Sequence, residues 1–275
     1  MKILQKIIML LSVGMLFTGC EEVITVDLDT APPRLVVDAS IDWLKNTTGH
    51  EQKITLSTTT GYYNAEFPTV SGAVVTITNA SNKIFNFTEI PGTGQYVCRD
   101  FLPVIGQTYN LKIILNGQTY TASETMTAVP EIEDYIEQNN NGGDSGDQVE
   151  ITYYYQDDAS QANAYLTSIS QPHIPFPELE VEHDENTNGN LMQESYSSEK
   201  LKTGDKIDIR LYGISKNYYD YMFKLILASG NDGSPFPTIP STVRGNIVNQ
   251  TDSKNYAFGY FRLTEMDLKS YVIGN

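Results

Sequence analysis

The sequence predicts a mainly all-β protein of two β-sandwich-like units, the second of which carries one α-helix. The composition favours this class: only 19% of the 275 residues are charged, Tyr occurs 18 times, and Thr, Asn and Gly recur between short apolar runs. Apolar and polar residues alternate in these runs, as at 73–78, which is typical of a strand with one buried and one solvent-facing side. Asn116-Gly117 joins two such runs and predicts a tight hairpin, since both central residues of a type I′ turn need a positive φ.

The first unit is predicted over residues 34–129 and follows Pro32-Pro33. Its short strands and the turns between them favour a sandwich of immunoglobulin-like or transthyretin-like type. We expect its strands at 34–41, 53–58, 73–78, 83–88, 95–99, 108–115 and 118–123.

The second unit is predicted over residues 130–275. Its first strand, 131–137, should pair with 149–155 across a loop at 139–147, which is too polar to pack and should form an exposed tip or linker. Further strands are expected at 163–170, 206–212 and 256–263.

One helix is predicted at 216–229. Ser215 can cap its start and Gly230 can close it. Its large apolar residues recur at helical spacing and share one face: Ile214, Tyr218, Tyr221, Met222 and Leu225. We interpret this face as part of the core, with stacking on a ligand as the alternative.

The N-terminus carries the clearest functional signal. Lys2 and Lys6 precede an apolar run at 7–17, which predicts an export signal over residues 1–19. The run is too short to span a bilayer, which needs about 20 apolar residues. The ending LFTGC at 16–20 resembles the lipobox of bacterial lipoproteins and implies that Cys20 is acylated and anchors the chain in a lipid bilayer. A plain secretory signal is the alternative.

Residues 20–33 would then form a tether. Glu21-Glu22 resembles the acidic export signal of surface-exposed Bacteroidota lipoproteins, which implies a place on the cell surface; an ordinary acidic tether facing the periplasm is the alternative. Asp29-Thr30-Ala31 resembles the O-glycosylation acceptor of the same bacteria, so Thr30 is a candidate glycosylation site in an accessible segment.

The charge restricts the partners. The formal charge is −16, and loss of Lys2 and Lys6 with the signal takes it to −18. Nucleic acid and anionic lipid surfaces are therefore not expected as partners, because phosphate binding requires clustered Lys and Arg. Cations and basic protein surfaces are favoured. Cys98, the one thiol left after acylation of Cys20, lies in a strand-like run and is interpreted as a core residue.

A calcium-like motif occupies residues 184–189. Asp184, Asn186 and Asn188 with Gly189 fit the first half of a D-x-[DN]-x-[DN]-G loop and are the candidate ligands of a weak structural calcium. The closing Glu of such a loop would fall at Ser195. A polar hairpin tip turning at Asn188-Gly189 is the alternative.

No catalytic residues are predicted, and no other cofactor is expected. GDSG at 143–146 matches the serine region of trypsin-like proteases, but it lies in the polar loop without a convincing histidine partner. SSEK at 197–200 and KTG at 202–204 match elements of penicillin-binding enzymes that should lie far apart, with S-D-N between them. The three histidines form no H-E-x-x-H motif, so a zinc site of usual spacing is not expected.

Four stretches together resemble one family. They are PRLVVDA at 33–39, GQTYNL at 106–111, GDKIDI at 204–209, and GNI at 245–247 followed by FGYF at 258–261. Their order is similar to that in domain of unknown function 4249, a family of Bacteroidota lipoproteins. The resemblance implies an outer-membrane lipoprotein, often encoded beside a TonB-dependent transporter, with no assigned catalytic residues.

We therefore expect a non-enzymatic binding or accessory lipoprotein at the outer membrane, exposed on the cell surface and acting beside a TonB-dependent transporter. A surface adhesin or a structural spacer module is the alternative, and a hydrolase finds no support in the motifs.

Overall fold

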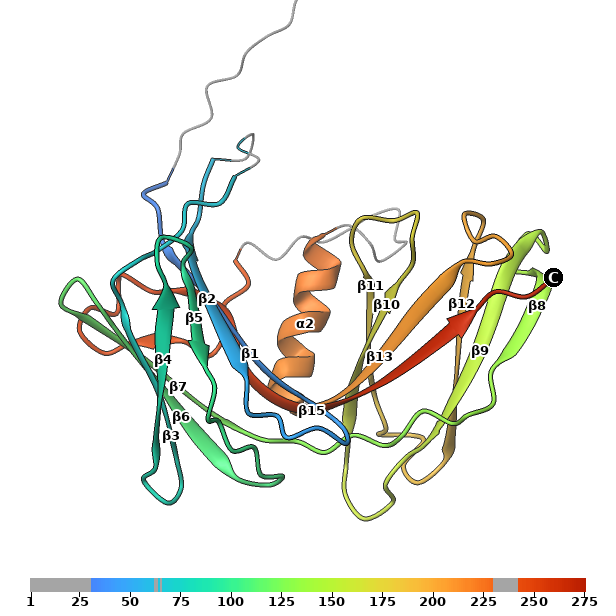
Figure 1. Cartoon of the computed structure of the whole chain (residues 1–275), viewed down its shortest axis with the longest axis horizontal. Coiled ribbons are helices and arrows are strands. Elements are labelled where there is room, and N and C mark those ends of the chain that lie inside the picture. The colour runs from blue at the N-terminus through green and yellow to red at the C-terminus, as the bar shows by residue number, and fades with distance from the viewer. Residues whose placement is uncertain (1–30, 62–63, 65, 230–241) are drawn as a thin grey trace, which may run out of the picture. The chain divides into compact units, whose positions relative to one another are not determined.

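Most of the described chain is β-structure arranged around one long sheet (Figure 1). The computed structural model describes residues 31–61, 64, 66–229 and 242–275. The predicted signal, Cys20, Thr30 and the helix-closing Gly230 lie outside these ranges. Within them the chain forms fifteen strands and one helix, which confirms the predicted mainly all-β class with a helix in its second part.

The first part of the chain contains all the strands predicted for it, with ends that differ by at most three residues. Alternate side chains are buried, as for Val37, Ala39 and Ile41. At the predicted hairpin Asn116 has φ 49° and Gly117 has φ 75°, as a type I′ turn requires. The strands are β1 (Leu35–Leu44), β2 (Gln52–Thr58), β3 (Val74–Asn79), β4 (Ile84–Ile90), β5 (Gln95–Cys98), β6 (Thr108–Leu115) and β7 (Gln118–Thr125).

The second part departs further from the sequence prediction. Its elements are β8 (Glu137–Gly142), β9 (Gln148–Gln156), β10 (Ala164–Ser170), β11 (Glu178–His183), β12 (Leu191–Ser198), β13 (Lys206–Ile214), α2 (Lys216–Ala228), β14 (Val248–Asn249) and β15 (Phe258–Val272). Strands β11, β12 and β14 were not predicted.

The strand predicted at 131–137 is wrong. Ile132 forms only an isolated bridge to Tyr155, and the strand that pairs with β9 is β8, which starts at Glu137 and uses residues 139–142 of the predicted loop. Its polar side chains are tolerated because β8 is the edge of its sheet, where they can remain in water.

Helix α2 begins where the sequence predicts. The Ser215 hydroxyl accepts a hydrogen bond from Tyr218 N at 3.2 Å, which satisfies one of the free N–H groups of the first turn. Tyr218 and Met222 are buried, as expected for a core face. Leu225, predicted on the same face, is instead 41% exposed. The helix is therefore covered by the sheet along part of its predicted apolar face only.

The described strands form two sheets. The larger has the order β11-β10-β13-β15-β1-β2-β5-β4-β3-β6-β7-β14, and the smaller has the order β12-β9-β8. The 15-residue strand β15 lies between β1, to which it is parallel, and β13, to which it is antiparallel (Figure 1). Helix α2 lies in the hollow of the curved large sheet (Figure 1).

This arrangement differs from a division of the chain at residues 129 and 130. One core contains buried residues between Leu35 and Met126, and another contains residues between Val129 and Leu211. The C-terminal part returns to the first core, however, through Ile247, Phe261 and Leu263. Residues 33–275 form one compact unit because β15 pairs with β1 along its first half and reaches the second core with its last residues.

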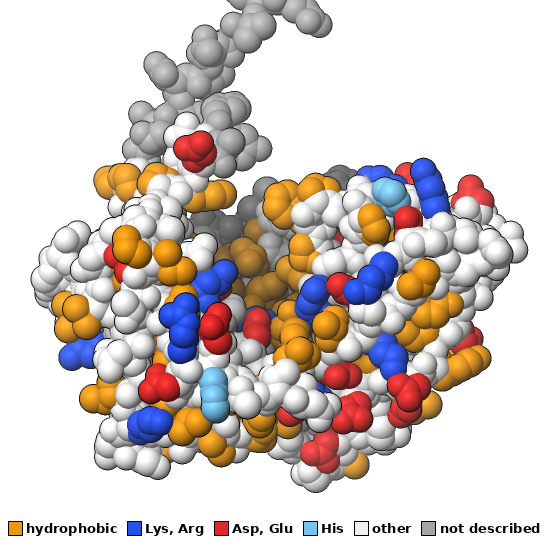
Figure 2. All heavy atoms as spheres, viewed as in Figure 1, with side chains coloured by type: hydrophobic (Ala, Val, Ile, Leu, Met, Phe, Trp, Pro, Cys, Tyr) orange, Lys and Arg blue, Asp and Glu red, His pale blue; other side chains and the backbone are white. Residues whose placement is uncertain are grey.

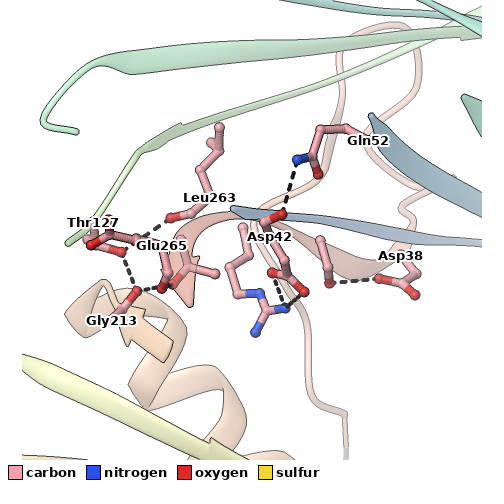
Figure 3. Close-up of polar contacts among 10 residues, drawn as sticks. Asp38, Asp42, Gln52, Thr127, Gly213, Leu263 and Glu265 are labelled. Atoms are coloured by element: carbon pink, nitrogen blue, oxygen red, sulfur yellow. Dashed lines mark hydrogen bonds and ion pairs between the residues drawn. The ribbon is translucent and has the colours of Figure 1, made fainter. Parts of the chain in front are cut away.

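The connection between the two parts of the chain crosses the sheet at Gly213 (Figure 3). A Cβ on Gly213 would lie 1.7 Å from the carbonyl oxygen of Ala128, so only glycine fits at this crossing. Thr127 and Thr264 both donate their hydroxyls to the Gly213 carbonyl. Glu265 accepts from Val129 N at 3.1 Å and pairs with Lys45 at 3.3 Å, which fixes the connection against β15.

Helix α2, the one helix in the described ranges, is not long and apolar enough to cross a membrane.

Candidate binding groove

A groove follows the outer edge of β11. This strand ends the twelve-stranded sheet, and among the described residues it is hydrogen-bonded to a neighbouring strand on one side only, to β10. A cavity of about 570 Å³ lies here and is lined from β11 by Glu178, Leu179, Glu180 and Val181. We call it the β11 groove. Because successive side chains of a strand point to opposite faces, the groove reaches both faces of β11.

One wall of the β11 groove is apolar. Leu179 and Val181 lie on the face of β11 toward α2, which contributes Phe223, Ile226 and Leu227. Phe223 is 47% exposed and Leu179 is 40% exposed, and hydrophobic side chains gather in the hollow where α2 lies (Figure 2). The apolar face of α2 is thus incompletely covered by the described residues.

A second cavity extends this apolar wall. It measures about 650 Å³ and shares Glu178, Leu179 and Ile226 with the β11 groove. Its far side is formed by the segment before β11, where Phe176 is 77% exposed, and by Leu225 of α2. A large apolar area bordering a groove is typical of an interaction surface.

The other wall is acidic and aromatic. Glu178 and Glu180 lie opposite Ile169 and Thr167 of β10, so they share the face that looks toward β9 and β12. The Tyr196 hydroxyl donates to Glu178 Oε1 at 2.7 Å. The Tyr153 hydroxyl donates to Thr167 Oγ1 at 3.1 Å. These contacts orient two phenol rings and a carboxylate at the groove.

Further carboxylates lie beside this wall, close to one another. Burial raises the pKa of Glu194 on β12 to about 8, and the charge of Glu182 and a hydrogen bond that protonated Glu194 donates to it act in the same direction. Burial also raises the pKa of Glu180, with a further contribution from Glu182. Like charges in a partly dehydrated site repel one another, so a cationic group entering the groove would be stabilised there.

A separate cavity of about 550 Å³ lies at the start of α2. Its polar groups already have partners within the chain: Ser215 Oγ donates to Glu124 Oε2 at 3.0 Å, and Asn163 N donates to Asp184 Oδ2 at 2.7 Å. These contacts favour a structural role for this cavity's polar groups.

A buried ion pair holds α2 on the sheet. Arg262 of β15 donates to both carboxylate oxygens of Asp42, at 2.6 and 2.8 Å (Figure 3). Its guanidinium lies 4.8 Å from the ring centre of Tyr212 and 5.2 Å from that of Tyr218 on α2. Burial raises the pKa of Asp42, while the charge of Arg262 opposes that shift. The groups link strand, sheet and helix, and we assign them a structural role.

The three candidate calcium ligands are placed differently from one another. Asp184 is buried and its Oδ2 accepts from Asn163 N, whereas Asn186 and Asn188 are exposed. Gly189, with φ 76°, donates its N–H to Asp157 Oδ2 at 2.7 Å and so closes the loop between β11 and β12. Asn188 has no positive φ, so the chain does not turn at Asn188-Gly189 in the type I′ geometry. Calcium binding stays a prediction.

Cys98 and Ser145 each lie beside an aspartate of the chain. Cys98 is buried, its Sγ lies 3.2 Å from Asp100 Oδ1, and burial raises the pKa of the thiol to about 11. Ser145 of the GDSG motif is exposed and donates to Asp147. Within the described ranges no three His, Cys, Asp or Glu side chains are placed to hold a metal ion.

The sequence interpretation missed the groove. Its central strand reads Glu-Leu-Glu-Val-Glu-His, which alternates as a strand does, and this signal was available. The exposure of one end of α2 could not be predicted from the sequence, because a periodic apolar face does not indicate how much of the helix a sheet covers.

Comparisons with known proteins place the chain in a family. The family model for a domain of unknown function (DUF4249) matches residues 21–267, so the chain belongs to this family, as its four stretches suggest. A search of curated proteins finds no match.

A comparison with solved structures finds chains of low similarity, among them the following three. A segment of two fibronectin type III domains from chicken tenascin is 15% identical, covering 66% of this chain and 90% of that chain at a TM-score of 0.21. The chicken interferon gamma receptor alpha chain is 11% identical, covering 66% and 88% at 0.20. A DUF4785 family protein from Legionella pneumophila is 7% identical, covering 65% of this chain and 52% of that chain at 0.24.

Proposed function

We propose that this member of the DUF4249 family is a non-enzymatic lipoprotein that is anchored in the outer membrane through Cys20 and binds a protein partner. The partner we propose is a TonB-dependent transporter, and the site of action is the cell surface. The proposed anchoring and cellular location rest on the residues LFTGC at 16–20 and on the Glu21-Glu22 that follows them.

The observation that supports binding is the β11 groove. It combines a strand whose outer edge pairs with no other described strand, an apolar wall with Phe223 exposed and an acidic wall with Glu180 exposed. Groups of this kind suit recognition of another chain, because backbone, apolar and charged contacts are offered side by side. An acidic groove also agrees with the preference for basic protein surfaces that a formal charge of −18 for the mature chain implies.

Membrane anchoring is tested by fractionation. The Cys20→Ala variant should move from the membrane fraction to the soluble fraction, because each methylene of an acyl chain contributes about 0.8 kcal/mol to membrane binding. Mass spectrometry of the wild-type N-terminus should find acyl groups on Cys20. A variant that stays in the membrane, together with an unmodified wild-type cysteine, contradicts the anchor.

Partner binding is tested by co-purification from detergent-solubilised outer membranes. We expect a TonB-dependent transporter, identified by mass spectrometry, with the wild-type protein and a reduced yield with Phe223→Ala. Ile84→Ala is the matched control, since Ile84 is a similarly exposed apolar residue on β4. Recovery of the protein without any transporter contradicts the proposed partner and favours the adhesin or spacer alternative.

A further inference from the structure

We propose that the free edge of β11 binds an extended segment of the partner protein as an added strand, and that this segment alternates apolar residues with Lys or Arg. The inference rests on the proposed function as a binding protein and names the chemistry of the segment that is bound.

The backbone of β11 supplies the first part of the argument. Its six residues pair with β10 from Ala164↔His183 to Ile169↔Glu178, which uses one edge of the strand. In the described chain no strand pairs with the other edge. An edge of this kind presents N–H and C=O groups that an incoming strand can pair with, at a spacing of about 4.8 Å.

The two walls of the groove supply the side-chain pattern. Directly opposite residues of paired strands lie on the same face of a sheet. A residue added opposite Leu179 or Val181 would therefore meet the apolar side chains of α2, such as Phe223 and Ile226. A residue added opposite Glu178, Glu180 or Glu182 would meet carboxylates and the Tyr153 and Tyr196 rings, which favour a cation. The bound strand must alternate in the same way.

A second copy of this chain does not fit the pattern. In an antiparallel pair of two β11 strands with both faces matched, Glu180 would lie opposite its own copy and Glu178 opposite Glu182. Like charges directly opposite each other destabilise a strand pair. An anionic membrane is excluded by the same carboxylates. The observations thus favour a basic, apolar segment of a different protein.

The test uses synthetic peptides and the mature chain with Cys20→Ala, whose residues 33–275 form one compact unit that contains the described cores. The peptide Lys-Val-Arg-Leu-Lys-Val should bind in a calorimetric titration. A peptide of the same composition without alternation and the acidic peptide Glu-Val-Glu-Leu-Glu-Val should bind at least tenfold more weakly.

Strand addition is tested without changing the protein. Two N-methylated forms of the basic peptide are made, each methylated at alternate amides. In a strand, alternate N–H groups point to opposite sides, so one form should lose binding at least tenfold and the other should bind nearly as well as the parent. Equal affinity of both forms and the parent overturns the strand-addition proposal.

Charge reversal tests the acidic wall. Glu180→Lys should weaken binding of the basic peptide at least tenfold and strengthen binding of the acidic peptide. Glu185→Lys is the control, because Glu185 is 77% exposed and lies outside β11. If both peptides respond alike to the two substitutions, the proposed side-chain pattern is wrong. Dimerisation of the wild-type chain that Glu180→Lys abolishes would identify a second copy as the occupant and overturn the proposal.

The peptide experiments and the transporter experiment can overturn the two proposals independently. Loss of peptide binding with the transporter still captured overturns the added strand and leaves the proposed function standing. Peptide binding with no transporter captured overturns the proposed partner and leaves the chemistry of the β11 groove.

Discussion

The two ends of the twelve-stranded sheet are built in opposite ways. At one end β14 has two residues, and its Asn249 side chain donates to Gln118 Oε1 and Asn255 O and accepts from two backbone N–H groups. At the other end β11 has six residues and borders a groove. Proteins commonly shorten or cover sheet edges to prevent unwanted pairing. The short edge at β14 follows that rule and the six-residue edge at β11 does not, and the proposed binding of a partner strand at β11 rests on this difference.

The largest predicted effect concerns Arg262, which lies on β15, a strand in the interior of the sheet. Arg262→Ala should lower the free energy of unfolding by about 3–5 kcal/mol, because it removes a buried guanidinium that lies over Tyr212 and leaves the half-buried carboxylate of Asp42 without its partner. Urea denaturation measures the change. Arg210→Ala is the control, since Arg210 forms a more open pair with Asp208 and its loss should cost about 1 kcal/mol or less. Equal losses would contradict the structural role of Arg262.

The closed edge should be sensitive to substitution. Asn249→Ala removes four hydrogen bonds at a residue that is 4% exposed, and we expect a loss of about 2–3 kcal/mol in urea denaturation. At the open edge, Phe223→Ala should change stability by about 0.5 kcal/mol or less, because the side chain is half exposed. If Phe223→Ala costs as much as Asn249→Ala, the two edges do not differ in the way described.

The acidic wall of the groove should make stability depend on pH. The pKa of Glu194 is raised from 4.5 to about 8, so the folded protein binds a proton that the unfolded chain releases between these values. Stability should therefore fall as pH rises from 4.5 to 8. Glu194→Gln should reduce this fall by about 1 kcal/mol after allowance for solvent screening. A pH profile identical to wild type in urea denaturation would show that Glu194 does not titrate in this range.

The smallest predicted effect concerns calcium at the loop that joins β11 to β12. With only Asp184 supplying a carboxylate, affinity should be on the order of 10⁻⁴ to 10⁻³ M, and calcium at its dissociation constant would stabilise the fold by about 0.4 kcal/mol. Thermal unfolding in millimolar calcium and in chelator measures the shift. Asn186→Ala should abolish it; no shift in wild type, or the same shift in the variant, leaves the loop closed by Asp157 and Gly189 alone.

Strands β1 to β7 could be predicted from the sequence in most respects, and strands β8 and β11 could not. Along β1 to β7 buried apolar residues alternate with more exposed ones, and this pattern predicts strands. Asn116-Gly117 predicts the turn that it forms. In β11 the glutamates at alternate positions lower the apolar signal that identifies a strand, although the alternation itself can be seen in the sequence. In β8 the strand contains asparagines that resemble a loop.

Long-range pairing was also beyond the sequence. Nothing local in Phe258–Val272 says that it pairs in parallel with β1, more than two hundred residues earlier, and this pairing is what joins the two cores into one unit. The cap at Ser215 was predictable because it acts within one helical turn. The exposure of Leu225 was not, since it depends on where the sheet ends beneath the helix.

The most direct test of the open edge is hydrogen exchange at single amides, measured by NMR with and without the basic alternating peptide. We predict that the peptide slows exchange at alternate amides of Glu178–His183, the ones that face away from β10, and leaves Val248–Asn249 unchanged. Protection that is absent from β11, or that appears instead at β14, would contradict the claim that β11 is the edge at which this protein binds its partner.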